Sequence, residues 1–255
     1  MLHRVRHGKS TELPALLIVH GLFGSARNWG AIAKRLSDTR AVVAVDMRNH
    51  GASPFAGTHS YADLARDLAE VIADEGQPMD VVGHSMGGKA AMVLALTRPE
   101  LTNRLVVADI APVAYDHSQA HLIEAMRAMP LDGLTTRSEA SDRLAASVPD
   151  PQVRAFLLQS LDLRADPPRW RLNLDVLERE MDAITGWPDD PAFQPYSGPA
   201  LFFSGGASDY VRPEHRARIK ALFPKARMAK LPGAGHWLHA EQPRAFEQTL
   251  RVFLD

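Results

Sequence analysis

The sequence contains no cysteine among its 255 residues. Disulfide bridges, thiolate nucleophiles and cysteine-ligated metal ions are therefore excluded. No set of histidines and carboxylates has the spacing of a zinc hydrolase, and no G-x-x-x-x-G-K-[ST] loop for nucleotide phosphates is present. We accordingly expect neither a metal ion nor a cofactor. The lack of cysteine also fits a cytoplasmic location, which is the location we expect.

An excess of one charge and long apolar runs are missing as well. The formal net charge is -1, so no electrostatic surface for nucleic acid or for an anionic membrane is expected. The longest apolar runs, such as residues 15–19 and 41–45, have strand length and are too short to span a bilayer. No apolar signal segment follows the basic residues near Met1. A monomer and a small homo-oligomer both stay open.

Strand-like and helix-like segments alternate along most of the chain. Such alternation implies a mostly parallel sheet with helices on both faces. The expected strands are residues 2–5, 16–19, 41–45, 79–82, 105–108, 200–204 and 226–231. The expected helices are residues 28–36, a helix that begins at Ser60, and residues 90–96, 213–222 and 243–254.

This alternation stops between Pro112 and Pro199. Three helical patterns occur there, and no convincing buried strand separates them. We therefore divide the chain into a core, residues 1–111 and 199–255, and an all-helical lid, residues 112–198, inserted before the last two strands. Such a lid would cover the carboxyl edge of the sheet, where open α/β sheets bind ligands. A helical layer without substrate contact is the alternative.

The segment Gly83-His84-Ser85-Met86-Gly87 has the form G-x-S-x-G between an apolar run and an alanine-rich helical run. This context predicts a nucleophile elbow, in which the serine hydroxyl projects above the sheet from a tight strand-to-helix turn. The two glycines remove side chains where the strand and the helix approach each other closely. Chance matches to a five-residue pattern occur, but the flanking strand and helix argue against one here.

A serine needs a general base, because at its ordinary pKa the hydroxyl is a poor nucleophile. Among the eleven histidines, His236 stands in a glycine-flanked loop between the last expected strand and the last expected helix. That location would bring its imidazole over the sheet edge towards Ser85. We predict His236 as the base and keep His239, three residues later, as the alternative.

Several motifs together resemble the α/β-hydrolase superfamily, and more narrowly the YbfF-type bacterial esterases and the abhydrolase-domain-11 group. The resemblance covers essentially the whole chain and is weakest between residues 112 and 198. It implies the α/β-hydrolase fold, with nucleophile, acid and histidine in that order along the chain. The motifs are His20-Gly21 to Ser25, the turn from Asp46 to Ser53, Gly83 to Lys89, Asp109-Ile110-Ala111-Pro112, Gly205-Gly206, and Gly233-Ala234-Gly235-His236-Trp237.

The acid that orients His236 has two candidates, because Asp109 and Asp209 both follow expected strands. The general superfamily position favours Asp209, whereas the closer resemblance matches the motif at Asp109. We choose Asp109 on that resemblance and keep Asp209 as the alternative. Ser208 is then expected to help by donating a hydrogen bond within the histidine and aspartate network.

The oxyanion of the reaction needs preorganised donors. We expect the backbone amides of Met86, which follows the nucleophile, and of Leu22, in the loop after His20-Gly21. Met and Trp side chains in the lid suggest an apolar pocket, although such residues also fill cores. The predicted pocket residues are Phe23, Met126, Trp170, Trp187 and Trp237.

These features predict a serine hydrolase that cleaves carboxylic esters, with acyl thioesters as further substrates, through an acyl-enzyme intermediate. Ser85 argues strongly against a dehalogenase or an epoxide hydrolase of this fold, whose elbow nucleophile would be aspartate. The alternatives are a carbon–carbon hydrolase, an acyltransferase or a cofactor-free haloperoxidase that uses the same serine. A more distant one is a binding protein on an inactive hydrolase fold.

Overall fold

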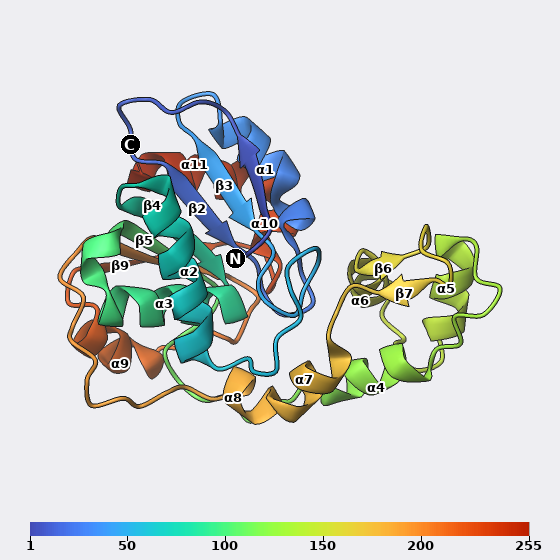
Figure 1. Cartoon of the computed structure of the whole chain (residues 1–255). Coiled ribbons are helices and arrows are strands. Elements are labelled where there is room, and N and C mark those ends of the chain that lie inside the picture. Colours follow the sequence, from blue (N-terminus) through green and yellow to red (C-terminus); the bar gives the residue numbers. More distant parts are fainter. Residues whose placement is uncertain (255) are drawn as a thin grey trace.

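A seven-stranded sheet runs through the centre of the computed structural model, which describes residues 1–254 (Figure 1). The strand order is β1-β3-β2-β4-β5-β8-β9, in which β1 is antiparallel to β3 and the other neighbours are parallel. The strands are β1 (Arg4–His7), β2 (Leu16–Val19), β3 (Val42–Val45), β4 (Met79–His84), β5 (Thr102–Ala108), β8 (Ala200–Gly205) and β9 (Ala226–Leu231).

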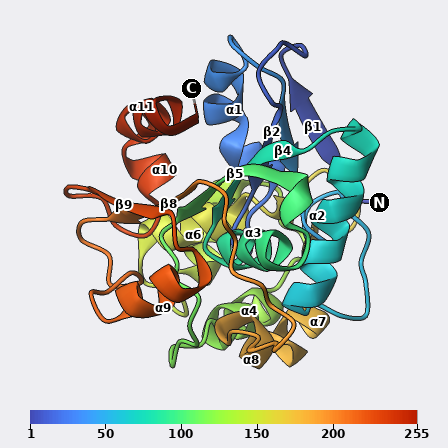
Figure 2. The same ribbon diagram turned by 90° about the vertical axis from the view of Figure 1, so that its left-hand side faces the viewer.

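Both faces of the sheet are buried, which explains why β2, with the sequence LLIV, and β3, with the sequence VVAV, are apolar throughout. In β2, Leu17 and Val19 belong to one apolar cluster, and Leu16 and Ile18 belong to the other, as the two-residue period of a strand requires. Two layers of helices enclose the sheet in this way (Figure 2). The first cluster includes α2 (Tyr61–Glu75), α3 (Met86–Thr97) and α9 (His215–Leu222); the second includes α1 (Gly30–Leu36), α10 (Leu238–Glu241) and α11 (Pro243–Leu254).

Local signals fix both ends of α2. Ser60 precedes it, and its side chain accepts a hydrogen bond from the backbone N–H of Asp63, as in an N-cap. The helix ends at Gly76, whose φ of 79° is the left-handed conformation that glycine adopts without strain. Two other expected elements shift: the first strand lies at Arg4–His7, and a short 3-10 helix (Ala26–Trp29) precedes α1.

The segment between β5 and β8 leaves the sheet and lies beyond its carboxyl edge (Figure 1). It is not all-helical, contrary to the sequence prediction, because Leu161 pairs with Trp170 and Asp162 with Arg169 in a short antiparallel ladder. Strands of two residues are too short to give a periodic pattern. The elements are α4 (Ala120–Ala128), α5 (Arg137–Leu144), α6 (Pro151–Leu158), β6 (Leu161–Asp162), β7 (Arg169–Trp170), α7 (Leu174–Arg179) and α8 (Met181–Thr185). Within residues 1–254, no helix is long and apolar enough to cross a membrane.

Candidate active site

Ser85 lies on the turn between β4, near the middle of the sheet, and α3. Its φ of 52° and ψ of -122° are strained for a residue with a side chain, and this backbone raises the hydroxyl above the sheet. Two residues before and two residues after Ser85, the turn has room only for glycine. A Cβ atom on Gly83 would collide with the Gly87 carbonyl, and one on Gly87 would collide with the His20 carbonyl.

A line of hydrogen bonds joins Ser85, His236 and Asp109. His236 Nε2 lies 3.1 Å from Ser85 Oγ, and its Nδ1 lies 2.8 Å from Asp109 Oδ2. Asp109 directly follows β5, and His236 follows β9, so three strand ends supply the three side chains. The geometry suits a base that accepts the serine proton on Nε2 while Nδ1–H donates to the carboxylate.

The carboxylate of Asp109 is fully buried, and the protein supplies it with further donors. Its Oδ1 accepts from the Gly205 amide at 2.9 Å, and its Oδ2 accepts from Ser208 Oγ at 2.5 Å. Hydrogen bonds to an ionised carboxylate are stronger than neutral ones and offset its burial. The structure therefore places Ser208 where the sequence analysis expects a helper, on the oxygen that also faces His236.

The two alternative residues lie elsewhere. The Asp209 side chain is 80% exposed and faces Arg212 at 3.5 Å. His239 is buried, and its ring stacks on Trp29 with the ring centroids 4.1 Å apart. The structure thus brings neither the alternative acid nor the alternative base into the line with Ser85.

Tyr210 is a site residue that the sequence analysis missed. Its ring stacks on His236 at a centroid distance of 4.0 Å and an interplanar angle of 18°. Its carbonyl accepts a hydrogen bond from the Tyr115 hydroxyl at 2.7 Å. Burial, with a smaller contribution from Asp109, raises the pKa of Tyr210 to about 12, so the phenol stays neutral beside the imidazole. Its nearness to Asp209 in the sequence was the only available signal.

The predicted oxyanion amides belong to residues that line the cavity at Ser85, namely Leu22 and Met86. Within residues 1–254, neither amide has a hydrogen-bond acceptor in the protein. For Met86 this follows from its place in the first turn of α3, where helix N–H groups have no partner. The next amide of the loop, that of Phe23, donates instead to His50 Nε2 at 3.1 Å.

A cavity of about 490 Å³ opens above Ser85 and extends to the inserted segment. Phe23 and Trp237 line it, as the sequence analysis predicts, and α4 and α6 contribute apolar side chains. The polar groups include Ser85, His236 and Lys89. The apolar lining includes Leu22, Phe23, Ile110, Leu122, Val148, Val153, Phe156 and Trp237.

Met126, Trp170 and Trp187 are not lining residues, so their prediction as pocket residues is corrected. Met126 is fully buried in the apolar core, and Trp170 Nε1 donates to the Met126 carbonyl at 2.9 Å. Trp187 packs beside Phe193, with the ring centroids 6.1 Å apart. These large side chains pack the inserted elements against each other and against the core. Residue type alone does not distinguish such packing from contact with a substrate.

Lys89, one helical turn after Ser85, is a second residue that the sequence analysis missed. Its side chain is buried, and Nζ donates to the carbonyls of Thr185 at 2.8 Å and Gly186 at 2.5 Å. Nζ also lies 4.8 Å from the centre of the Tyr115 ring. Burial lowers the pKa of Lys89 to about 7. Among residues 1–254, no group of three or more histidine or carboxylate side chains is arranged to hold a metal ion.

Comparisons with known proteins agree with this architecture. The model of the alpha/beta hydrolase family matches residues 16–249. The sn-1-specific diacylglycerol lipase ABHD11 of Mus musculus is 41% identical over 252 residues, which cover 95% of this chain and 81% of that protein. Esterase YbfF of Escherichia coli (strain K12) is 38% identical over 243 residues, 94% of this chain and 92% of that protein.

Among solved structures, a marine microorganism esterase superposes with a TM-score of 0.93 at 38% identity, and the match covers 99% of this chain and 98% of that chain. A family match over nearly the whole chain, together with relatives of this identity, is decisive. The chain therefore belongs to the alpha/beta hydrolase family.

Proposed function

We propose that this protein is a serine hydrolase that cleaves carboxylic esters through an acyl-enzyme intermediate. The observation that carries the proposal is the continuous hydrogen-bonded line from Asp109 through His236 to Ser85 at the cavity. Relatives named as a lipase and as an esterase, at 41% and 38% identity, support the same reaction class.

The proposed reaction begins when Ser85 Oγ attacks the ester carbonyl carbon and His236 Nε2 accepts the hydroxyl proton. Asp109 holds the Nδ1–H tautomer and stabilises the imidazolium that forms. The amides of Leu22 and Met86 donate to the developing oxyanion, a contribution of about 3 kcal/mol for each donor of this kind.

The intermediate then collapses, and His236 returns the proton to the leaving alcohol oxygen. A water molecule attacks the acyl-enzyme with His236 as base, which releases the acid and restores Ser85. Thioesters fit the same steps, with a thiol as the leaving group.

Residues 112–198 serve as the lid in this proposal, and residues 1–111 and 199–255 as the catalytic core. Side chains of α4 and α6 line the cavity together with Phe23 and Trp237. An apolar lining favours an apolar acyl chain, because burial of each CH₂ group contributes about 0.8 kcal/mol. The cytoplasmic location and the monomeric or small oligomeric state stay predictions.

The test is a hydrolysis panel of p-nitrophenyl esters of increasing chain length, with acyl-CoA thioesters alongside, and labelling by a fluorophosphonate. We expect an adduct on Ser85 and a loss of about 10⁴- to 10⁶-fold in kcat for Ser85→Ala. Absence of an adduct from the folded wild-type protein would contradict the proposal and favour a binding protein. Product analysis with added alcohol, hydrogen peroxide or a β-diketone separates acyl transfer, perhydrolysis and carbon–carbon cleavage from hydrolysis.

A further inference from the structure

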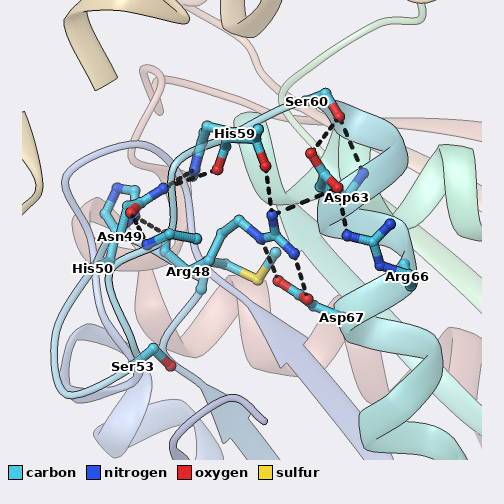
Figure 3. A network of polar contacts seen from close by, with 12 residues as sticks. Arg48, Asn49, His50, Ser53, His59, Ser60, Asp63, Arg66 and Asp67 are labelled. Atoms are coloured by element: carbon cyan, nitrogen blue, oxygen red, sulfur yellow. Dashed lines mark hydrogen bonds and ion pairs between the residues drawn. The ribbon is translucent and has the colours of Figure 1, made fainter. Parts of the chain in front are cut away.

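The turn that follows β3 is held by an extensive polar network (Figure 3). Arg48 forms a two-pronged ion pair with Asp67 of α2, with Nε–Oδ2 and Nη2–Oδ1 distances of 2.6 and 2.7 Å. The Asn49 side-chain amide donates to the Thr58 carbonyl at 3.1 Å and to His59 Nδ1 at 3.2 Å. Since the ion pair is bidentate and the amide uses both protons, this turn has little freedom to move.

His50, in the same turn, faces the loop that carries the candidate oxyanion amide. Its ring is fully buried, and Nδ1 lies 2.9 Å from the Arg48 carbonyl, to which Nδ1–H donates. This bond leaves Nε2 as a lone-pair acceptor, and Nε2 accepts from the Phe23 amide at 3.1 Å. Burial lowers the pKa of His50 to about 3, so the ring remains neutral and keeps this tautomer at neutral pH.

Phe23 is held from the opposite side by the inserted segment. The Ser160 hydroxyl donates to the Phe23 carbonyl at 2.8 Å. The same segment also pairs with the turn itself, because the Asn173 amide donates to the Asn49 carbonyl at 3.0 Å and the Gly51 amide donates to the Arg171 carbonyl at 2.8 Å. The turn therefore contacts the lid and the catalytic loop at once.

The backbone of Phe23 shows why such support is needed. Its φ of 63° lies in the left-handed region, which is strained for a phenylalanine and persists only when surrounding contacts enforce it. The Phe23 amide is committed to His50, whereas the adjacent Leu22 lines the cavity and its amide has no acceptor within the described residues. A second buried ring supports the other donor: His59 Nε2–H lies 3.2 Å from the sulfur of Met86.

We propose that His50 is a positioning residue for ester cleavage, which fixes the Leu22 amide as an oxyanion donor and links the position of that amide to the lid. The inference rests on the proposed function, since it assigns a role within the same reaction. His50 does not touch the substrate. It acts through the Phe23 peptide.

The test compares His50→Leu, which removes the acceptor, with His50→Gln, whose Oε1 can accept at the place of Nε2. We expect His50→Leu to lower kcat by about 10- to 100-fold with KM changed less than about twofold, because only the transition state carries the oxyanion. The affinity for a trifluoromethyl ketone, whose adduct with Ser85 bears an oxyanion, should fall by the same factor as kcat/KM. His50→Gln should recover most of both losses.

Tyr196→Phe is the matched control, because it also removes a buried hydrogen bond but at the far end of β5. The Tyr196 hydroxyl donates to the Thr102 carbonyl at 3.0 Å. This variant should lower the unfolding temperature and leave kcat and ketone affinity unchanged. The pH midpoint of kcat/KM should be the same in wild type and in the His50 variants, since the line from Asp109 to Ser85 stays intact.

Several results would overturn the inference. One is a folded His50→Leu variant with wild-type kcat and ketone affinity; another is a loss that appears only in KM, or one that His50→Gln does not recover. If His50→Leu does not fold, Ser160→Ala, which removes only the lid contact to the Phe23 carbonyl, must lower kcat and ketone affinity together. Fluorophosphonate labelling of wild-type Ser85 is scored first: its failure counts against the proposed function, whereas normal labelling with unaffected variants counts against His50 alone.

Discussion

At the residue scale, backbone strain is concentrated at the candidate site. The non-glycine residues with positive φ among the described residues are Phe23 at 63°, Asn49 at 66°, Ser85 at 52° and Asp109 at 52°. Each follows a strand of the parallel part of the sheet, β2, β3, β4 and β5 in turn. Such conformations cost roughly 1–3 kcal/mol each, so the surrounding contacts must enforce them. The same turns supply the candidate nucleophile, the candidate acid, the candidate oxyanion loop and the support of that loop.

The two aspartates give a direct test of the acid. Asp109→Asn should lower kcat on a p-nitrophenyl ester by about 10⁴-fold, the loss known for the corresponding change in a serine protease, because the amide no longer stabilises the correct histidine tautomer. Asp209→Asn should stay within about twofold of wild type, since that side chain is 80% exposed and faces Arg212. The reverse pattern would show that the loop after β8 rearranges to supply the acid.

Sequence reasoning identified residues whose signal is local. The glycines around Ser85 and those before His236 mark the turns directly, so these side chains could be found without a structure. Asp109 could not be chosen from spacing, because both aspartates follow strands, and only the resemblance separated them. What places Asp109 at His236 is the Gly205 amide and Ser208 hydroxyl, which reach it from nearly a hundred residues away along the chain.

At the scale of elements, α2 and α3 hold the end of α8, the last helix of the inserted segment. The Tyr61 hydroxyl of α2 donates to the Ile184 carbonyl at 2.6 Å, and Lys89 of α3 donates to the next two carbonyls. The Tyr115 amide, at the start of the insertion, donates to the Thr185 carbonyl at 3.0 Å. The start of the insertion and the end of α8 are thus joined to each other, and Lys89 joins the end of α8 to α3, the helix that follows Ser85.

Lys89→Met is expected to change how stability depends on pH. Burial lowers the pKa of Lys89 to about 7 from 10.5, so between these values the unfolded chain binds a proton that the native protein lacks. Wild-type stability should therefore rise with pH in this window, by up to about 1.4 kcal/mol per pH unit from this group. Below pH 7 both states are protonated and the contribution is constant.

Urea unfolding at pH 7.5 and 9.5 measures this effect. The free energy of unfolding of wild type relative to that of Lys89→Met should increase between the two pH values. Lys34→Met, which removes an exposed lysine, is the control, and its difference from wild type should be the same at both pH values. A gap between wild type and Lys89→Met that is the same at both pH values would mean that the buried amine does not titrate in this window.

Elements were predicted well where a long periodic pattern and a cap coincide. The closing helix, Pro243–Leu254, agrees with the sequence prediction to the residue, and α2 begins where Ser60 and Asp63 indicate. The inserted segment was predicted least well. Its short helix α5 is mostly polar, and its two-residue strands exist only because β6 and β7 pair with each other, a tertiary contact that no local pattern encodes.

At the scale of the whole molecule, buried histidines surround the carboxyl edge of the sheet. Burial lowers the pKa of each below 6.5, to about 4 for His20 and to about 3 for His50 and His239. The same cause lowers the pKa of His59 and of His84. These rings act as neutral donors and acceptors: His84 Nε2–H, for example, donates to the His236 carbonyl at 2.8 Å. Protonation of these rings at low pH would therefore destabilise the edge that holds the candidate site.

We expect the protein to lose stability steeply as the pH falls from 6.5 towards 4. In this range the unfolded chain takes up protons on histidines that the native protein keeps neutral, so each contributes a loss of about 1.4 kcal/mol per pH unit. His239→Phe should reduce the slope by one such contribution, because the new ring can still stack on Trp29. Urea midpoints at pH 7.5, 6.0 and 5.0 measure the slope, with exposed His121→Gln as the control. If wild type and His239→Phe lose stability in parallel from pH 6 to 5, the His239 ring takes up protons in the native protein as readily as in the unfolded chain, which contradicts the prediction.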